Sequence, residues 1–211
     1  MTKMNIDLNE IARITRGAPK GRLEDSRDES VEVAVVQPVN LGPLGLEGEL
    51  SVATVARYKM ETYRLKGGEV LISLLDPPDA LLRVGLVTSD TPFAAAGWLF
   101  SGPRDLVAGA NVAIIRLHTD QLDVQFLALY LRSQAAARQL RAVRAGSVQS
   151  YLNIAALGRV RIPIPPLEEQ RRAAHLHESY ERYAQETNRL LHAERQLMQA
   201  SFDRWFRTTG G

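Results

Sequence analysis

The sequence predicts an α+β protein, in which a mixed, β-rich domain with packed helices is followed by one long C-terminal helix. Short β-branched runs separated by Gly and Pro fill the first part of the chain, whereas a helical apolar spacing runs from residue 167 almost to the end. The segment RVRIPIPPLEEQ (159–170) joins the two parts, because an apolar run, three prolines and two glutamates are typical of a strand, a stiff corner and a helix start. We therefore expect a domain at residues 1–165 and a helical arm at 166–211.

The N-terminal half predicts short elements separated by loops. Residues 7–14 are expected to form a short helix or strand, and the basic segment TRGAPKGR (15–22) a loop. The glycines of residues 40–50 indicate a turn or a bulged hairpin. The expected strands are residues 31–39, 58–65, 69–75, 82–88, 111–117 and 160–164, with a helical turn as the alternative for 58–65.

The spacing of apolar residues becomes helical after residue 123. Residues 124–144 carry apolar side chains at a 3.6-residue period and end before Gly146, which predicts one helix of about 20 residues. Residues 147–157 (SVQSYLNIAAL) are expected to form a polar loop followed by a short helical turn.

The predicted arm is a helix of about 40 residues, or about 60 Å. Its apolar stripe keeps a heptad rhythm that Glu194 interrupts. A helix of this length needs a partner for its stripe, and the helix expected at 124–144 is only half as long. Pairing with another chain is therefore preferred, with packing on the chain's own domain as the alternative. The residues expected at the dimer seam are Leu176, Tyr180, Tyr183, Thr187, Leu190 and Leu197.

Composition excludes several kinds of chemistry. The chain has 211 residues and no cysteine, which rules out disulfides, thiolate metal ligands and a cysteine nucleophile and suits a reducing cytoplasm. The N-terminal residues lack the apolar core that a signal peptide would have, and no apolar run is long enough to cross a membrane. The formal charge is +2. The arm carries seven basic and seven acidic residues, so the excess lies in the preceding domain.

Motifs of catalysis are not apparent in the sequence. The glycines at 42, 45 and 48 do not have the spacing of a phosphate-binding loop. His175 and His177 lie two residues apart on the arm and so point to different helix faces, which argues against a shared metal. Asp76 and Asp79 flank two prolines, as loop-capping aspartates also do. We therefore expect no catalytic residue, no metal and no cofactor bound by this chain.

The junction RIPIPPLEEQRRAA resembles that of specificity subunits of type I restriction–modification enzymes. In that family a target-recognition domain ends in an I-P-[IL]-P-P-L-x-E-Q motif and continues into a long helix. KGGEVLISL (66–74) is similar to a family strand, with Glu69 where Asp is commoner, and three later segments follow in the family's order. These segments are ANVAIIRL (110–117), FLALYLRS (126–133) and AGSVQSYLNIAAL (145–157). The likeness spans residues 60–207.

The resemblance implies a non-catalytic DNA sequence-recognition subunit. Family members typically carry two recognition domains and two helices, whereas this chain has one of each, so it resembles a half-subunit. The implied assembly is a homodimer, in which the C-terminal helices of two copies pair antiparallel, that reads a bipartite palindromic site on double-stranded DNA. The implied partners are a methyltransferase subunit, which uses S-adenosylmethionine, and possibly a restriction subunit. The alternative is a scaffold protein with a coiled-coil arm that does not read DNA.

The residues expected to contact DNA lie in polar, basic loops on the β scaffold. They form three groups: one in the RGAPKGR loop, one around the turn at 66–68, and one in the polar loop after residue 143. The candidates are Arg16, Lys20 and Arg22, then Arg64 and Lys66, then Arg144, Ser147, Gln149, Ser150 and Tyr151.

Overall fold

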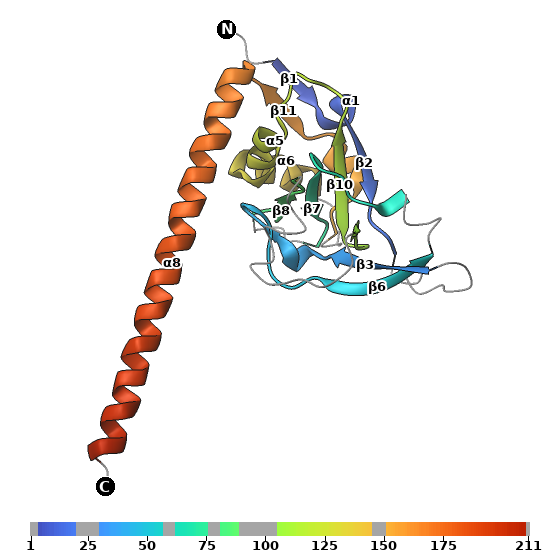
Figure 1. The fold of residues 1–211 in the computed structure, drawn as a ribbon. Helices are drawn as coiled ribbons and strands as arrows, with labels where there is room; N and C mark the ends of the chain where they lie inside the picture. Colours follow the sequence, from blue (N-terminus) through green and yellow to red (C-terminus); the bar gives the residue numbers. More distant parts are fainter. Residues whose placement is uncertain are drawn as a thin grey trace. The chain divides into compact units, whose positions relative to one another are not determined.

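The structure is a computed structural model that describes residues 4–19, 30–56, 62–75, 81–88, 105–144 and 151–209. The chain divides into two compact units, Met1–Ala174 and His175–Gly211. The first unit is a mixed α and β domain and the second is helical (Figure 1). The predicted α+β fold class is therefore confirmed.

A four-stranded antiparallel sheet forms the middle layer of the first unit. Its order is β2-β10-β7-β8, made by Ala12–Arg16, Val112–Leu117, Val70–Ser73 and Val84–Leu86. Along each strand, successive side chains point to opposite faces of the sheet. Here both faces are buried. Ala113 and Ile115 pack into the core beneath the helices, whereas Val112 and Ile114 pack into a second core. The dense apolar sequences of β7 and β10 are what a strand covered on both faces requires.

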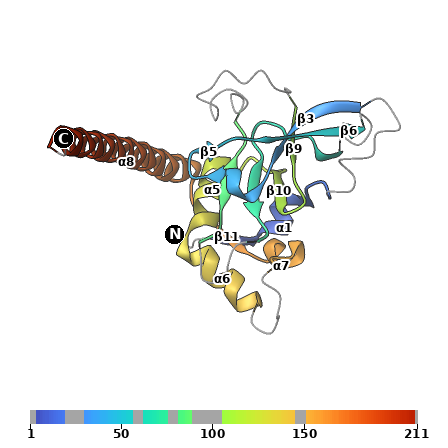
Figure 2. The same ribbon diagram turned by 90° about the horizontal axis from the view of Figure 1, so that it is seen from below.

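The second core lies between the middle sheet and a three-stranded sheet. This sheet has the order β6-β3-β9, from Ser51–Ala56, Ser30–Val36 and Leu106–Ala108, with β3 parallel to β9. A 3-10 turn, Pro38–Asn40, ends β3, and a small hairpin of β4 (Leu41–Gly42) and β5 (Gly45–Leu46) follows. Seen from below, β3, β6 and β9 lie on one side of β10, and α6 and α7 lie on the other (Figure 2).

The helices cover the other face of the middle sheet. They are α1 (Leu8–Ile11), α5 (Val124–Arg132), α6 (Gln134–Arg144) and α7 (Ile154–Gly158). The first strand, β1 (Met4–Asp7), pairs antiparallel with the last, β11 (Arg161–Ile164), which precedes the arm.

The single helix predicted for residues 124–144 is wrong, because two helices meet at Ser133. This residue has extended backbone angles (φ −73°, ψ 156°) and caps the next helix, its hydroxyl accepting a hydrogen bond from the amide of Ala136 at 3.3 Å. The apolar period continues across the break, so periodicity alone did not reveal it.

The strand predicted for residues 58–65 is also wrong where the structure describes it. Residues 62 and 63 are helical, which supports the alternative of a helical turn, and Arg64 forms a single β-bridge with Val107. Residues 58–61 lie outside the described residues, as do Asp76 and Asp79. The loop expected from residue 15 begins later, because β2 continues to Arg16.

The long helix predicted from Leu167 is confirmed as α8, Leu167–Thr209. Its 43 residues correspond to about 64 Å. Glu168 and Glu169 occupy the first turn and suit the positive end of the helix dipole. The first turns, up to Ala174, belong to the first compact unit, and the rest of α8 forms the second.

Candidate nucleic-acid interface

Arg16 occupies the last position of β2, opposite Ala113 of β10. Its Nε donates a hydrogen bond to the backbone carbonyl of Ala110, at 3.0 Å, in the turn that precedes β10. The strand and this hydrogen bond together hold the Arg16 side chain at one end of the middle sheet. Lys20 and Arg22, the other two members of the first predicted group, lie outside the described residues.

Tyr151 brings the third predicted group to the same place. The Cζ atom of Arg16 lies over the Tyr151 ring, 4.6 Å from its centroid. A cation–π contact of this kind contributes about 0.5–1 kcal/mol at an exposed site. The Tyr151 hydroxyl donates to the side-chain oxygen of Asn111, at 2.8 Å, so both side chains are held on the Ala110–Asn111 turn.

The backbone that leaves β2 is fixed by close packing. The amide of Gly17 donates to the Val112 carbonyl at 2.9 Å, and that of Ala18 to the Ala108 carbonyl at 2.8 Å. A Cβ atom on Gly17 would lie only 2.2 Å from the carbonyl oxygen of Gly109. Glycine is therefore required at position 17 for the chain to pass here, and the basic loop leaves the sheet from a rigid base.

The polar loop of the third group ends at the same turn. Leu152 donates its amide to the Leu74 carbonyl at 3.0 Å, and Leu74 donates to the Asn111 carbonyl at 2.9 Å. Arg144 is the last residue of α6, and its side chain lies outside the described part of the structure. The same is true of Ser147, Gln149 and Ser150. The structure thus brings the base of the first loop and the end of the third together.

The second predicted group is held at the other end of β10. The Arg64 guanidinium pairs with Asp105 at 2.7 Å, and its carbonyl accepts a hydrogen bond from Arg116 at 3.2 Å. Arg116 also pairs with the buried Glu69, whose carboxylate accepts from the amide of Lys66. Arg64 therefore has a structural role at this site, while Lys66 remains exposed.

The sequence prediction missed the role of Gln170, the glutamine of the junction motif. Its side chain is fully buried. The Oε1 atom accepts from the amide of Asp123 at 2.7 Å, and Nε2 donates to the carbonyls of Gln121, at 2.9 Å, and Pro165, at 2.7 Å. Gln170 thus joins the first turn of α8 to the segment that precedes α5. A glutamine after two glutamates at a helix start was the available signal.

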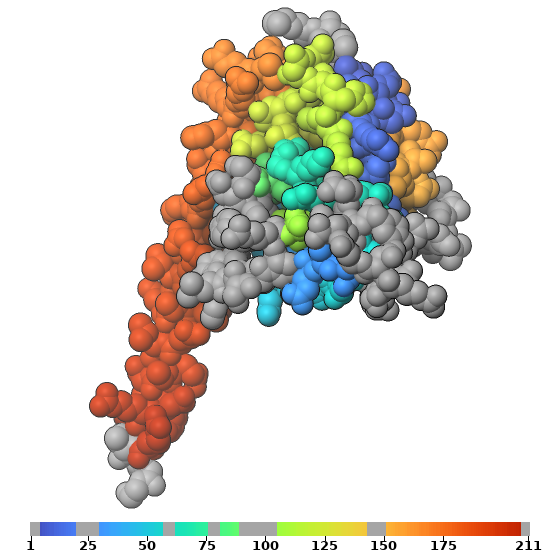
Figure 3. Space-filling model, turned by 45° about the vertical axis from the view of Figure 1, so that its right-hand side comes forward, coloured from blue at the N-terminus to red at the C-terminus, as the bar shows by residue number. Residues whose placement is uncertain are grey.

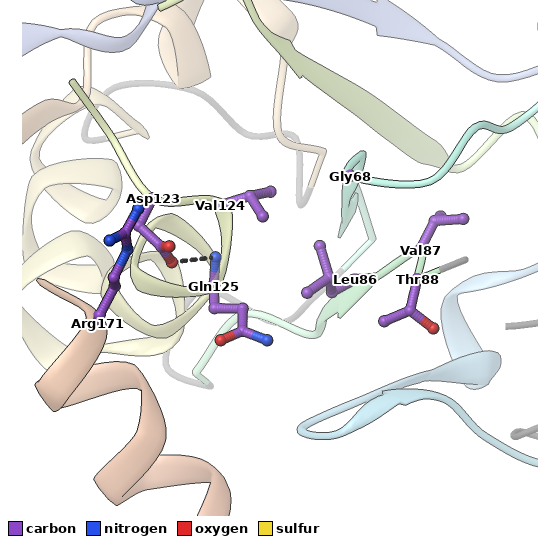
Figure 4. A pocket seen from close by; sticks show the side chains of 8 residues that line it. All are labelled: Gly68, Leu86, Val87, Thr88, Asp123, Val124, Gln125 and Arg171. Atoms are coloured by element: carbon purple, nitrogen blue, oxygen red, sulfur yellow. Dashed lines mark hydrogen bonds between the residues drawn. The ribbon is translucent and has the colours of Figure 1, made fainter. Parts of the chain in front are cut away.

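Beside this junction lies an open hollow of about 460 Å³, lined on its two sides by the β7–β8 region and by the start of α5 (Figure 4). Asp123 caps α5 there, accepting hydrogen bonds from the amides of Gln125 and Phe126. Arg171 of α8 completes the lining. Among the residues that the structure describes, no group of three His, Asp or Glu side chains is placed to hold a metal ion.

Most of the large apolar side chains of α8, the helix drawn in orange to red in Figure 3, are exposed in this single chain. Of the predicted seam, Leu176, Tyr183 and Leu190 are 71%, 73% and 67% exposed. Tyr180 and Leu197 are also exposed, and Thr187 is half-buried. Near the end of the helix Met198, Phe202, Trp205 and Phe206 are also exposed, on a face beside this seam. In the described part of the chain, no helix has the length and hydrophobicity of a membrane span.

Comparison with known protein families gives one match, over residues 6–194, to the family described as the type I restriction modification DNA specificity domain. No curated protein sequence matches the chain.

Solved structures share the fold. A chain from a structure of the complex assembly and conformational transition of the type I R-M system matches with a TM-score of 0.60 and 19% identity, over 93% of this chain and 43% of that one. The HsdS subunit from Thermoanaerobacter tengcongensis matches with a TM-score of 0.51 and 18% identity, over 89% of this chain and 39% of that one. The S subunit from M. genitalium matches with a TM-score of 0.52 and 13% identity, over 90% and 42%. The chain therefore spans about two-fifths of each.

Proposed function

Because this chain belongs to the family of type I restriction modification DNA specificity domains, we propose that it is the DNA sequence-recognition subunit of a type I-like modification complex. The observation that carries the proposal is the family match, which extends from residue 6 to residue 194 and so includes most of the chain. The contact of Arg16 with Tyr151 supports it, since the sheet holds together two side chains that border polar segments, and side chains carried on a rigid scaffold suit the reading of base edges.

Catalysis is proposed to take place in partner subunits. A methyltransferase subunit would bind S-adenosylmethionine and transfer its methyl group to DNA, and a restriction subunit would cut. This chain would supply the choice of sequence. Such a complex acts on cellular DNA, so we place it in the cytoplasm.

The arm is proposed to join two copies of the chain. The exposed apolar stripe requires a partner helix, and the chain spans about two-fifths of the solved subunits that it matches. A two-fold dimer would present two recognition domains to the two halves of a split palindromic site. Sedimentation velocity of the chain and of a Leu176→Glu, Leu190→Glu variant tests this. We expect a dimer and a monomer respectively, and a monomeric unmodified chain would contradict the proposal.

DNA reading is tested by selection from random duplexes, using the chain together with its co-expressed methyltransferase subunit. We expect one bipartite motif to be enriched, with affinity that falls steeply as salt rises. The triple change Arg16→Ala, Lys20→Ala, Arg22→Ala is expected to weaken binding at all salt concentrations tested. Glu178→Gln, an exchange on the arm, is the control and should leave the motif unchanged. No enriched motif from the assembled complex would refute the function.

The alternative is a scaffold that binds protein partners without reading DNA. The formal charge of only +2 and the pairing of Arg64 with Asp105 favour it, because both leave little positive charge for phosphates. A chain of this kind would assemble with its partners and give equal affinity for all duplexes in the same selection.

A further inference from the structure

We propose that the arms of two copies pair antiparallel in one defined register, in which Glu194 accepts a hydrogen bond from the hydroxyl of the partner's Tyr183. This inference rests on the homodimer proposed above, in which the helices pair antiparallel, and adds their register. It follows from where α8 carries polar side chains within its apolar stripe.

The seam of α8 consists of positions spaced alternately three and four residues apart. In chain order they are Ala173, Leu176, Tyr180, Tyr183, Thr187, Leu190, Glu194, Leu197, Ser201 and Arg204. Leu190 and Leu197, on either side of Glu194, are 67% and 70% exposed. Glu194 therefore lies in the middle of an apolar stripe, where a paired helix would cover it.

A parallel pair would place like charges together. In a parallel, in-register dimer each seam residue faces its own copy, so the two Glu194 carboxylates would meet in the seam, and so would the two Arg204 side chains. Burial of two like charges without a partner is costly. The seam thus disfavours the parallel arrangement.

An antiparallel pair with its two-fold axis between residues 188 and 189 avoids this conflict. Each seam residue then faces another seam residue. The facing pairs are Ala173 with Arg204, Leu176 with Ser201, Tyr180 with Leu197, Tyr183 with Glu194, and Thr187 with Leu190. The Tyr183 phenol is a donor that reaches a facing carboxylate, and Arg204 faces the small Ala173 and can extend to solvent.

Neighbouring registers leave Glu194 without a hydrogen-bond donor. Sliding one helix by a heptad in either direction places Glu194 opposite Leu176 or Leu190. Sliding by two heptads places it opposite Glu169 or Leu197. A buried carboxylate facing an apolar side chain or another carboxylate costs free energy, so one polar residue in the seam selects one register.

The flank of the seam nearest the axis is compatible with the same alignment. One flank of the seam carries Leu191, Met198 and Trp205, whereas the other carries Ser179 and Glu186. Antiparallel helices bring like flanks together, and in the proposed register Leu191 of one copy lies beside Ala184 and Leu191 of the other, close to the axis.

Disulfide trapping tests the register, because the chain has no cysteine of its own. A mixture of the Tyr183→Cys and Glu194→Cys variants, oxidised under mild conditions, is expected to give a cross-linked dimer. The matched mixtures Leu176→Cys with Glu194→Cys and Leu190→Cys with Glu194→Cys report the registers one heptad away and are expected to remain largely uncross-linked. Efficient cross-linking in either of them, or of Glu194→Cys with itself, would overturn the proposal.

A second measurement tests the register independently of whether the dimer forms. Tyr183→Phe is expected to raise the dimer dissociation constant about tenfold, which corresponds to about 1.4 kcal/mol. Glu194→Gln keeps an acceptor for the phenol and is expected to change it less than threefold. A stable dimer with unchanged affinity in Tyr183→Phe refutes the register alone. A chain that is monomeric in sedimentation velocity refutes the homodimer as well.

Discussion

Replacement of Gln170 by glutamate perturbs the buried junction at the start of α8 with little change of shape. The wild-type side chain accepts one hydrogen bond from the Asp123 amide and donates two, to the carbonyls of Gln121 and Pro165. Glutamate keeps the acceptor but turns a second oxygen toward the two carbonyls. The variant therefore replaces two attractive contacts by two repulsive ones at a fully buried position.

The expected loss follows from the number of contacts. A net hydrogen bond contributes about 1 kcal/mol, and a buried group left without its partner costs about 1–3 kcal/mol. Gln170→Ala, which loses all three bonds, is expected to lower the free energy of unfolding by about 3 kcal/mol. Gln170→Glu is expected to lower it by about 4 kcal/mol at neutral pH, because a buried charge is added.

The loss in Gln170→Glu should depend on pH. Burial and the two carbonyl dipoles disfavour the charged form, so the pKa of the introduced carboxyl rises on folding. A raised pKa in the folded state means that stability returns as the pH falls through that value. Protonated glutamic acid can again donate to one carbonyl.

Urea unfolding followed by circular dichroism at pH 7.5 and pH 5 measures this difference at one protein concentration. Gln125→Glu makes the same chemical change at an exposed site beside the junction and is expected to stay within about 0.5 kcal/mol of wild type. A Gln170→Glu variant as stable as wild type at pH 7.5, or equally destabilised at both pH values, would refute the reasoning.

Three other expectations concern the domain. Glu69→Ala leaves Arg116 without its buried partner and should lower the free energy of unfolding by about 3 kcal/mol, measured by urea unfolding; an unchanged midpoint would contradict the structural role of the pair. Gly17→Ala forces the new Cβ against the Gly109 carbonyl, so we expect the free energy of unfolding to fall by at least about 2 kcal/mol and the assembled complex to bind DNA more weakly. Unchanged stability and DNA binding would show that glycine is not required at this position. Burial raises the pKa of Tyr130 above its usual 10.0, so the stability linked to this phenol is present below pH 10 and lost as the pH rises further. Tyr130→Phe should therefore show a smaller fall of unfolding free energy between pH 9 and 11 than wild type, and an equal fall would exclude this residue as the cause.

The sequence predicted the helices and strands whose formation depends on a local residue pattern. The dense β-branched run before Pro38 became β3, and the apolar spacing after Pro166 became α8, because each pattern matches the period of its structure. The break at Ser133 escaped prediction, since the apolar period continues across it and only a capping hydroxyl marks it.

The candidate site was predictable only in part, because its contacts join distant segments. Arg16 and Tyr151 were each chosen for their loops, yet nothing in the sequence placed one over the other. Arg64 was chosen for its charge, and its pairing with Asp105 depends on a bridge to a strand far along the chain. Gln170 resembled an ordinary exposed residue of a helix start until its three buried contacts were seen.

The antiparallel pairing of β1 with β11 brings the first and last strands of the domain together. The chain enters through Met4–Asp7 and leaves through Arg161–Ile164, side by side, just before the arm begins. The polypeptide between these two strands therefore begins and ends at neighbouring positions, and Gln170 joins it a second time to the start of α8 through Gln121 and Asp123. Under the proposed function, a different segment between the same two strands would change the DNA sequence that is read and leave the arm unchanged.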